Sequence, residues 1–454
     1  MKKFVQILTA ATLAVSMLAG CGASQQKNET TATGAEGARE STATTAGDTA
    51  AQGDAAAAGS EELSGKITIW WWAEQMPIIE NFQKMYPNVE VEPVMVDAGD
   101  YFTKVQSTIA SGGKLPDILI GEISFRGKLF GLDILENLEA EPYNFDRTQV
   151  VDYLIPAMTD ENDQVLGIET CQSPAGMAYK RDLAKEYLGT DDPEELEAML
   201  KDWDTFIAKG KEVLEKSGNK ITMIPSLGDV YSMINGQSKT PRISGDTIDM
   251  AAVTDTFAQV AKFRDAGIVD KIVQWTPAWF SAYGSGNSIF YPTACWGVVD
   301  YVKANDEQGK GNWGLIVPPS GGFNWGGATM SITKTSENKL AAWKFIEFYN
   351  LTKEGTETKK VLGVLPTSKD GASDPYFSDD EDEFFAGQNI GDVWMNRVIP
   401  TIHLNPISKY DIPDVMAVEL VLSSMNADTS ITAEQAAELY KQEMENGAPE
   451  ITFK

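Results

Sequence analysis

Three consecutive tryptophans, Trp70, Trp71 and Trp72, are followed closely by Glu74 and Gln75. Indole rings offer flat apolar faces, while carboxylate and amide groups offer hydrogen bonds, and a binding site for a small molecule uses both. Trp70 and Trp71 lie within an apolar stretch typical of a strand, whereas Trp72 is its last residue. We therefore expect Trp72, Glu74 and Gln75 to reach a ligand. In the alternative interpretation, all three rings fill a core.

Other tryptophans also fall where the sequence predicts loops or strand ends. The chain holds 11 Trp and 14 Tyr residues, but the count alone does not indicate a site, because tryptophan also fills cores. Trp203 and Trp343 occur in predicted helices and are interpreted as packing residues. The tryptophans at predicted loops or strand ends are Trp72, Trp275, Trp279, Trp296, Trp325 and Trp394.

The composition argues against several kinds of chemistry. The chain has one histidine, His403, and three cysteines, which are too few for a His/Cys metal cluster, so we expect no metal and no cofactor. A Ser-His-Asp triad would depend on His403, and no nucleophile-elbow motif surrounds it. The formal net charge of −29 argues against nucleic acid as a partner.

The elements that would position these residues alternate between strand and helix. Residues 66–72, 89–96 and 116–121 form apolar stretches typical of strands, and residues 75–87 and 100–114 carry apolar side chains at helical spacing. Strands joined by helices in this way predict a parallel sheet with crossover helices. Ligands of such sheets bind beyond the carboxyl ends of the strands, and Trp72 lies at that end of the first strand.

The N-terminal residues predict export. A basic start and a short apolar segment lead to the residues LAGC, which end at Cys21. This pattern looks like a bacterial lipobox, in which the signal peptide is removed before a lipidated cysteine. We expect a signal peptide at residues 1–20, lipid on Cys21 that holds the protein at the outer face of the cell membrane, and a disordered tether at residues 21–63. The alternative is an ordinary signal peptide with an incidental cysteine.

With 454 residues, the chain is too long for one ordinary core, so two domains are expected. Short motifs typical of one family occur in order along nearly all of the mature chain. Besides the first strand and the ten-residue spacing from Gly286 to Trp296, they are FQKMYPNVEVEPV, YFTKVQSTIASGGKLPDILIGE, GMAYKRDLAKEYLG, DWDTFIAKGKEVLEKSG, NWGLIVPPSGG, GGATMSITKTSENKLAAWKFIEFY and LGVLPTS. In this order they resemble the extracellular solute-binding proteins of ABC sugar importers, the family that includes maltose-binding protein.

The resemblance implies an α/β fold of the periplasmic-binding-protein type II. Such a fold has two lobes, each with a mostly parallel sheet flanked by helices, hinged by two or three chain crossings. We expect lobe one at residues 64–172 and 316–350, and lobe two at residues 173–315 and 351–454. In such proteins the lobes close on a ligand by hinge bending.

The resemblance also implies a carbohydrate ligand, and the number of tryptophans favours an oligosaccharide. A sugar ring has apolar faces for stacking and a rim of hydroxyls that need polar partners when buried. We expect a monomer that delivers the sugar to membrane permease subunits of an ABC transporter. Matched to the family's motifs, with Trp275 added from the loop QWTPAW, the expected ligand-binding residues are Trp72, Glu74, Gln75, Glu122, Gln172, Ser173, Asp229, Tyr231, Trp275, Trp296 and Trp325.

Other functions stay open at this point. The same fold could bind a peptide or a cationic solute, because the predicted cleft loops are acidic and aromatic. A secreted glycoside hydrolase could use two of Glu74, Glu122, Glu169 and Asp229. No motif fixes two acids at a defined separation, however, so we expect a binding protein and not an enzyme. A surface adhesin or scaffold would show repeats, and the sequence has none.

Cys171 and Cys295 would both lie near the cleft. An oxidising compartment could pair them if their Cα atoms came within about 7 Å. A disulfide there would restrain the hinge, so we expect two free, partly buried thiols, while pairing stays an alternative.

Overall fold

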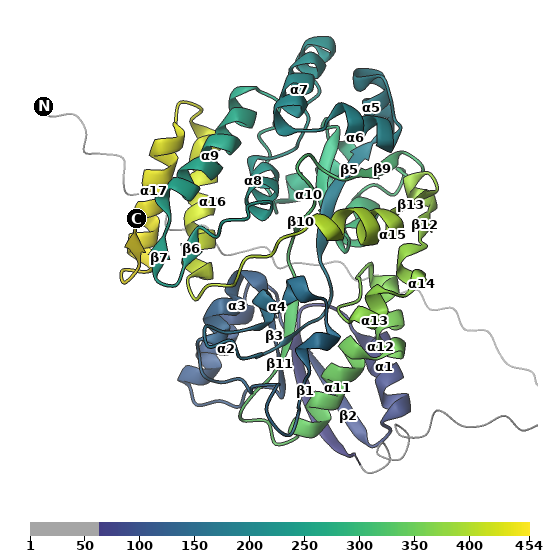
Figure 1. The fold of residues 1–454 in the computed structure, drawn as a ribbon, viewed down its shortest axis with the longest axis vertical. Helices are drawn as coiled ribbons and strands as arrows, with labels where there is room; N and C mark the ends of the chain where they lie inside the picture. Colours follow the sequence, from purple (N-terminus) through teal and green to yellow (C-terminus); the bar gives the residue numbers. More distant parts are fainter. Residues whose placement is uncertain (1–62) are drawn as a thin grey trace, which may run out of the picture. The chain divides into compact units, whose positions relative to one another are not determined.

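A computed structural model describes residues 63–454 of the chain. The predicted signal peptide, Cys21 and the tether up to residue 62 lie outside the described residues. Within the described part, two larger sheets form the centres of two lobes, which Figure 1 shows below and above its middle. The predicted two-lobed α/β fold is confirmed.

The first sheet has the strand order β2-β1-β3-β11-β4. β1 pairs in parallel with β2 and β3, and helices α1 and α2 connect these strands, which confirms the predicted crossover arrangement. β11 is antiparallel to both of its neighbours, β3 and β4. The bounds are β1 (Gly65–Trp71), α1 (Met76–Met85), β2 (Val89–Met95), α2 (Tyr101–Ala110), β3 (Ile118–Glu122), α3 (Ile123–Phe130), β4 (Ile168–Glu169) and β11 (Ala328–Ile332).

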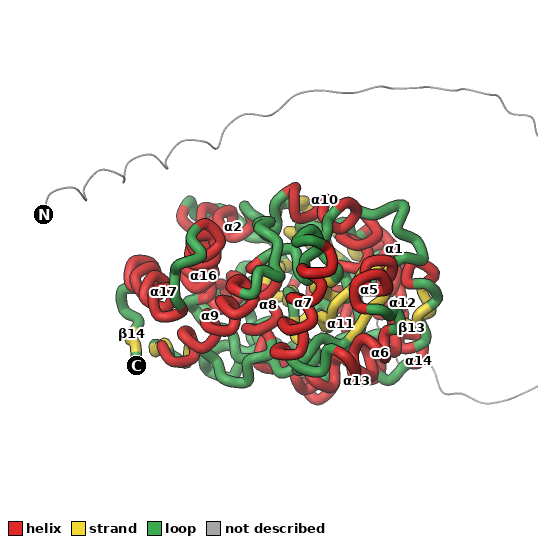
Figure 2. Tube along the Cα trace, turned by 90° about the horizontal axis from the view of Figure 1, so that it is seen from above, coloured by secondary structure: helices red, strands yellow, loops and turns green. Residues whose placement is uncertain are grey.

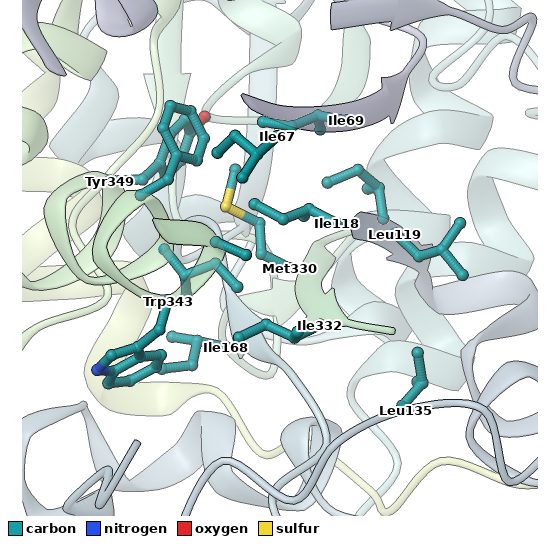
Figure 3. Close-up of a cluster of buried hydrophobic side chains, with 14 of the residues drawn as sticks. Ile67, Ile69, Ile118, Leu119, Leu135, Ile168, Met330, Ile332, Trp343 and Tyr349 are labelled. Carbon is teal, nitrogen blue, oxygen red and sulfur yellow. The ribbon is translucent and has the colours of Figure 1, made fainter. Parts of the chain in front are cut away.

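Alternation along β1 packs the core of the first lobe. Ile69 is buried together with residues of the other strands and with Trp343 and Tyr349 of helix α11 (Lys339–Leu351), as Figure 3 shows. The ring of Trp71 lies on the same face of β1, with its centroid 5.6 Å from that of Tyr349. Trp71 and Trp343 are therefore core residues, as expected.

The second sheet is centred on β5, which pairs antiparallel with β8, β9 and β10. We predicted a mostly parallel sheet in each lobe, and for these pairings the prediction is wrong. The reason is that β5 pairs with strands more than a hundred residues further along the chain, so the local alternation of strand and helix does not set their direction. The bounds are β5 (Pro174–Lys180), β8 (Phe290–Ala294), β9 (Trp313–Ile316) and β10 (Phe323–Asn324).

Helices cover the strands, as the view from above shows (Figure 2). Their ends follow local signals. For example, the side chain of Asp202 accepts a hydrogen bond from the backbone N–H of Thr205 at the start of α7, and Gly218 ends that helix with a φ of 63°. The principal helices of the second lobe are α5 (Arg181–Leu188), α6 (Pro193–Met199), α7 (Trp203–Ser217), α8 (Leu227–Gly236), α9 (Met250–Asp265), α10 (Pro277–Ser285), α16 (Asp411–Ala427) and α17 (Ala433–Gly447).

Within residues 63–454 the chain passes between the two sheets three times. The first passage joins β4 to β5, and the second joins β10 to β11. The third lies between α12 (Lys353–Thr358), which packs on α1 and α11, and α14 (Pro375–Ser378), which packs on the second lobe. The second and third passages lie at other positions than the predicted lobe bounds at 316 and 351, because β10 belongs to the second sheet and α12 packs on the first lobe. We propose lobe one at 64–169 and 328–368, and lobe two at 170–327 and 369–454.

Among the residues that the structure describes, no helix is long and apolar enough to cross a membrane, and no group of acidic, His or Cys side chains could hold a metal ion. Cys171 and Cys295 are both free and buried. This agrees with the expectation of two unpaired thiols.

Candidate functional site

A cavity of about 670 Å³ lies between the two lobes. Ile123 and Ser124, at the start of α3, contribute the wall from the first lobe. The second lobe contributes residues of α8 and α16, the loop around Trp275, residues 324–326 and residues 403–405. Figure 1 shows α3 below α8 and α16. A volume of this size falls within the range of small-molecule sites.

Two of the predicted tryptophans, Trp275 and Trp325, line this cavity. Their ring centroids are 5.7 Å apart with the planes inclined at 63°, so they form a corner. The Trp275 side chain is 45% exposed. Its φ is 66°, a left-handed conformation that is uncommon for a bulky residue. Strained backbone of this kind is concentrated at ligand sites.

Tyr231 also lines the cavity, beside a cluster of charged groups. The guanidinium of Arg242 lies 5.8 Å from the Tyr231 ring centroid, and its Nε donates to Asp414 Oδ1 at 2.8 Å. Arg242 Nη1 donates to Asn235 Oδ1. Arg242 is thus paired with Asp414, and Asp411 and Glu419 add two further carboxyl groups to the wall of the same cavity.

The lobes touch each other at the start of α16. Gly127 of α3 donates its backbone N–H to Asp411 Oδ2 at 3.2 Å. A Cβ at Gly127 would lie 2.0 Å from the backbone oxygen of Ser408, so only glycine fits there. Burial, with the neighbouring charge of Asp414, raises the pKa of Asp411 to about 7.

Asp229 was predicted to contact the ligand, and the structure places it behind the cavity wall. Its carboxylate is fully buried and accepts hydrogen bonds from Ser226 Oγ at 2.6 Å, Gln274 Nε2 at 2.8 Å and Trp279 Nε1 at 3.0 Å. Gln274 lines the cavity and adjoins Trp275. The geometry therefore favours a supporting role for Asp229, which holds the Trp275 loop.

The buried position of Asp229 leads to a test by pH. Burial raises its pKa from 3.8 to about 6, against the opposing effect of its three donors. The protonated form thus stabilises the folded protein below pH 3.8, and this contribution is lost as the pH rises to about 6, at up to about 1.4 kcal/mol per pH unit.

We expect the stability advantage of the unmodified protein over Asp229→Asn to fall between pH 4 and pH 6, since asparagine does not titrate. Urea unfolding of both proteins at several pH values measures this difference in the free energy of unfolding. A difference that stays constant over this range would contradict the shifted pKa.

The residues predicted after the first strand lie outside the cavity wall. The Trp72 ring is half-buried and meets Tyr101 edge-on, with the centroids 5.2 Å apart. Glu74 Oε1 accepts from the backbone N–H of Met76 at 2.9 Å, at the start of α1. Gln75 is buried, and its Oε1 accepts from the Tyr349 hydroxyl at 3.1 Å.

Glu122 adjoins the cavity at the end of β3. It caps α3 by accepting from the backbone N–H of Ser124 at 2.8 Å. Burial raises the pKa of Tyr301, in the second lobe, and the charges of Asp300 and Glu122 add to the effect. The observed role of Glu122 is therefore to cap α3, whose first two residues, Ile123 and Ser124, line the cavity.

Gln172 and Ser173 lie in the first passage between the sheets and are buried. Gln172 Nε2 donates to the backbone oxygen of Pro366 at 2.6 Å, which joins the first and third passages. The backbone oxygen of Ser173 accepts from the N–H of Trp325 at 3.0 Å. These two residues fix the passages and the position of Trp325.

Trp296 contacts the backbone of Trp325 and does not itself line the cavity. Its ring is half-buried, its Nε1 donates to the backbone oxygen of Trp325 at 3.1 Å, and its centroid is 5.2 Å from that of Tyr301. Around the cavity the structure thus brings together three of the predicted ligand-binding residues, Tyr231, Trp275 and Trp325. The other eight lie beside or behind the wall, or near the ends of β1.

Sequence reasoning missed the wall formed by α16. Val415, Val418, Glu419 and Leu422 all line the cavity. They recur at spacings of three and four residues, so they share one face of the helix. This periodicity could have marked a helix, but not the side that faces a ligand.

The two lobes and the cavity between them define a two-lobed solute-binding protein. Residues 77–386 match the family described as bacterial extracellular solute-binding protein. The chain belongs to this family, whose members are sugar-binding proteins of ABC transporters. It is therefore the binding component of a transporter and not an enzyme, so the glycoside hydrolase alternative is set aside.

Among the proteins similar to this chain are two sugar-binding relatives and several solved structures. The lactose-binding protein of Rhizobium radiobacter is 25% identical over 73% of this chain and 81% of the relative. The arabinooligosaccharide-binding protein of Halalkalibacterium halodurans is 24% identical over 66% and 69%.

A crystal structure of an extracellular solute-binding protein of family 1 has a TM-score of 0.76 at 19% identity, covering 84% of this chain and 99% of that one. The ABC transporter associated binding protein of B. animalis subsp. lactis Bl-04, in complex with β-1,6-galactobiose, has a TM-score of 0.69 at 16% identity, covering 86% of this chain and all of that one. At sequence identities this low, the similarity to these two structures supports the fold alone.

Proposed function

We propose that this protein captures an oligosaccharide in the cavity between its lobes and delivers it to membrane permease subunits. One observation carries the proposal: Trp275 and Trp325 form an aromatic corner in a cavity whose wall also holds polar side chains from both lobes. Rings inclined to each other can cover two sugar faces, and the polar groups can satisfy hydroxyls. The sugars in the names of the two relatives support this class of ligand.

The proposal includes the site of action. Lipid on Cys21 would hold the monomeric protein at the outer face of the cell membrane. Mass spectrometry of the mature protein from its native host tests the anchor. An acylated N-terminal Cys21 supports it, and an unmodified N-terminus at another residue overturns it.

A thermal-shift panel tests the ligand. The probes are lactose, maltose, β-1,6-galactobiose, arabinotriose, galactose and glucose. A sugar present at 100 times its Kd should stabilise the folded protein by about 2.7 kcal/mol and raise Tm. We expect at least one disaccharide or trisaccharide to raise Tm more than the monosaccharides do. A panel in which no sugar raises Tm would contradict the proposal.

A cationic solute is a second candidate, favoured by the carboxyl groups of Asp411 and Glu419 in the cavity wall. Putrescine and a basic tripeptide, run in the same assay at low ionic strength, separate the two candidates. A shift by either of these, without a shift by any sugar, would select the cationic solute.

A further inference from the structure

A direct contact joins the two lobes at a point outside the three passages of the chain. Helix α3 of the first lobe packs on α16 of the second lobe, and Gly127 lies at this contact. Figure 1 shows α3 and α16 to the left of β5, while α12 and α14, which flank the third passage, lie to its right. Turning the lobes apart about the passages therefore separates α3 from α16.

A turn at the start of α16 presents the carboxylate of Asp411 to α3. The backbone N–H of Asp411 donates to the backbone oxygen of Ser408 at 3.0 Å, and Asp411 Oδ1 accepts from the backbone N–H of Ser408 at 3.1 Å. These two hydrogen bonds fix the turn within the second lobe. Asp411 Oδ2 accepts from the N–H of Gly127 in the other lobe at 3.2 Å. The turn is thus preorganised, which reduces the entropy cost of making the contact.

Gly127 permits this close approach because it has no side chain. The three atoms nearest to a Cβ at this position, at 2.0 to 2.7 Å, all belong to Ser408 and Asp411 of the second lobe. A methyl group would meet the backbone of Ser408, which cannot turn away as a side chain can. Gly131 at the end of α3 differs, since the atoms nearest to a Cβ there are helix carbonyl oxygens at 3.5 and 3.6 Å, an ordinary contact distance.

The contact also lies between two cavities. Asp411 lines the cavity that holds Trp275 and Trp325. Gly127 and Ser408 line a second cavity between the lobes, of about 710 Å³. The contact is therefore part of the boundary of the first cavity.

We propose that Gly127 and the turn at residues 408–411 form a latch, which closes when the lobes come together and sets how long a captured solute is retained. This inference rests on the proposed function. Gly127 and Asp411 are positioning residues in this role, because they act through the relative placement of the lobes. A contact that exists in the closed form alone favours that form and so strengthens binding. Since the solute enters the open form, the latch governs dissociation more than association.

Gly127→Ala tests the latch, with Gly131→Ala as the matched control on the same helix. The probes are lactose, β-1,6-galactobiose and arabinotriose. Stopped-flow tryptophan fluorescence at pH 8, above the pKa of about 7 of Asp411, gives kon and koff. We expect Gly127→Ala to raise koff about 10- to 150-fold, as for the loss of a hydrogen bond to a charged group, with little change in kon. Gly131→Ala should keep both rate constants.

Small-angle X-ray scattering gives a second readout, which a purely local change would not alter. At a saturating concentration of the sugar, Gly127→Ala should have a larger radius of gyration than the unmodified protein and the Gly131→Ala control. An equal radius of gyration in all three proteins would contradict the latch.

Asp411→Ala tests the latch from the second lobe. Because Asp411 also lines the cavity, its loss could raise koff through a contact with the sugar. If both residues act through one latch, the double variant Gly127→Ala/Asp411→Ala should dissociate no faster than the faster single variant. A direct contact between Asp411 and the sugar would instead make the two effects on koff multiply.

The outcomes separate this inference from the proposed function. If the unmodified protein binds none of the three sugars, the proposed function fails, and this inference with it. If it binds one of them, and Gly127→Ala keeps the koff of the control or the two effects multiply, only this inference is overturned.

Discussion

Replacing Arg126 with methionine should destabilise the protein by about 3 to 5 kcal/mol. The Arg126 side chain is fully buried, and its Nη1 forms an ion pair with the buried carboxylate of Glu169. Its Nε also donates to the backbone oxygen of Gly121 at 2.8 Å. Removing one member of a buried pair leaves the other charge unpaired in a poorly solvated place, which is more costly than losing the attraction.

A double-mutant cycle measures the interaction free energy between Arg126 and Glu169. Urea unfolding of Arg126→Met, Glu169→Gln and the double variant gives three changes in the free energy of unfolding. The double variant should lose less than the sum of the single variants, because it leaves neither charge buried alone. Additive losses, or a loss below about 1 kcal/mol in Arg126→Met, would show that the pair is not buried as described.

Replacing Trp275 with alanine should weaken binding of the sugar selected by the thermal-shift panel by about 1 to 3 kcal/mol, or roughly 5- to 150-fold. The ring is exposed on the cavity wall and forms a corner with Trp325, so a sugar face can stack on it. Because the affinity depends on the area of the stacked ring, Trp275→Phe should lose only part of this binding free energy. Intrinsic fluorescence titration or calorimetry gives the Kd of each variant.

The positive φ of Trp275 supplies a matched control. Trp275→Gly also removes the ring, but glycine adopts this backbone conformation without strain. The glycine variant should therefore be at least as stable as the alanine variant and bind equally weakly. An alanine variant with unchanged affinity would remove Trp275 from the site.

Part of the fold followed from local patterns in the sequence. Alternation along β1 predicted opposite faces for Trp71 and Trp72, and their rings contact Tyr349 of α11 and Tyr101 of α2 respectively. The spacing of strands and helices predicted the parallel pairing of β1, β2 and β3. The antiparallel ladders of β5 could not be predicted in this way, because they join strands that are more than a hundred residues apart.

The site was less predictable than the fold. Residues after β1 and β3 were chosen because strand ends point to ligands, but most of the cavity wall comes from the second lobe. Asp229 lies in the first turn of α8, where its side chain turns inward to Gln274 and Trp279.

The pairing of β11 with β3 has a consequence for the order of events during synthesis. Gly121 and Thr329 are direct partners in this ladder, although they lie 208 positions apart. The first lobe therefore cannot complete its own sheet until the ribosome has made β11, which follows residues 170–327 of the second lobe. Contacts between residues so far apart in the sequence form slowly compared with local structure. The first lobe of the nascent chain therefore stays incompletely folded until β11 has been made, and an incompletely folded chain can still pass through a secretion channel.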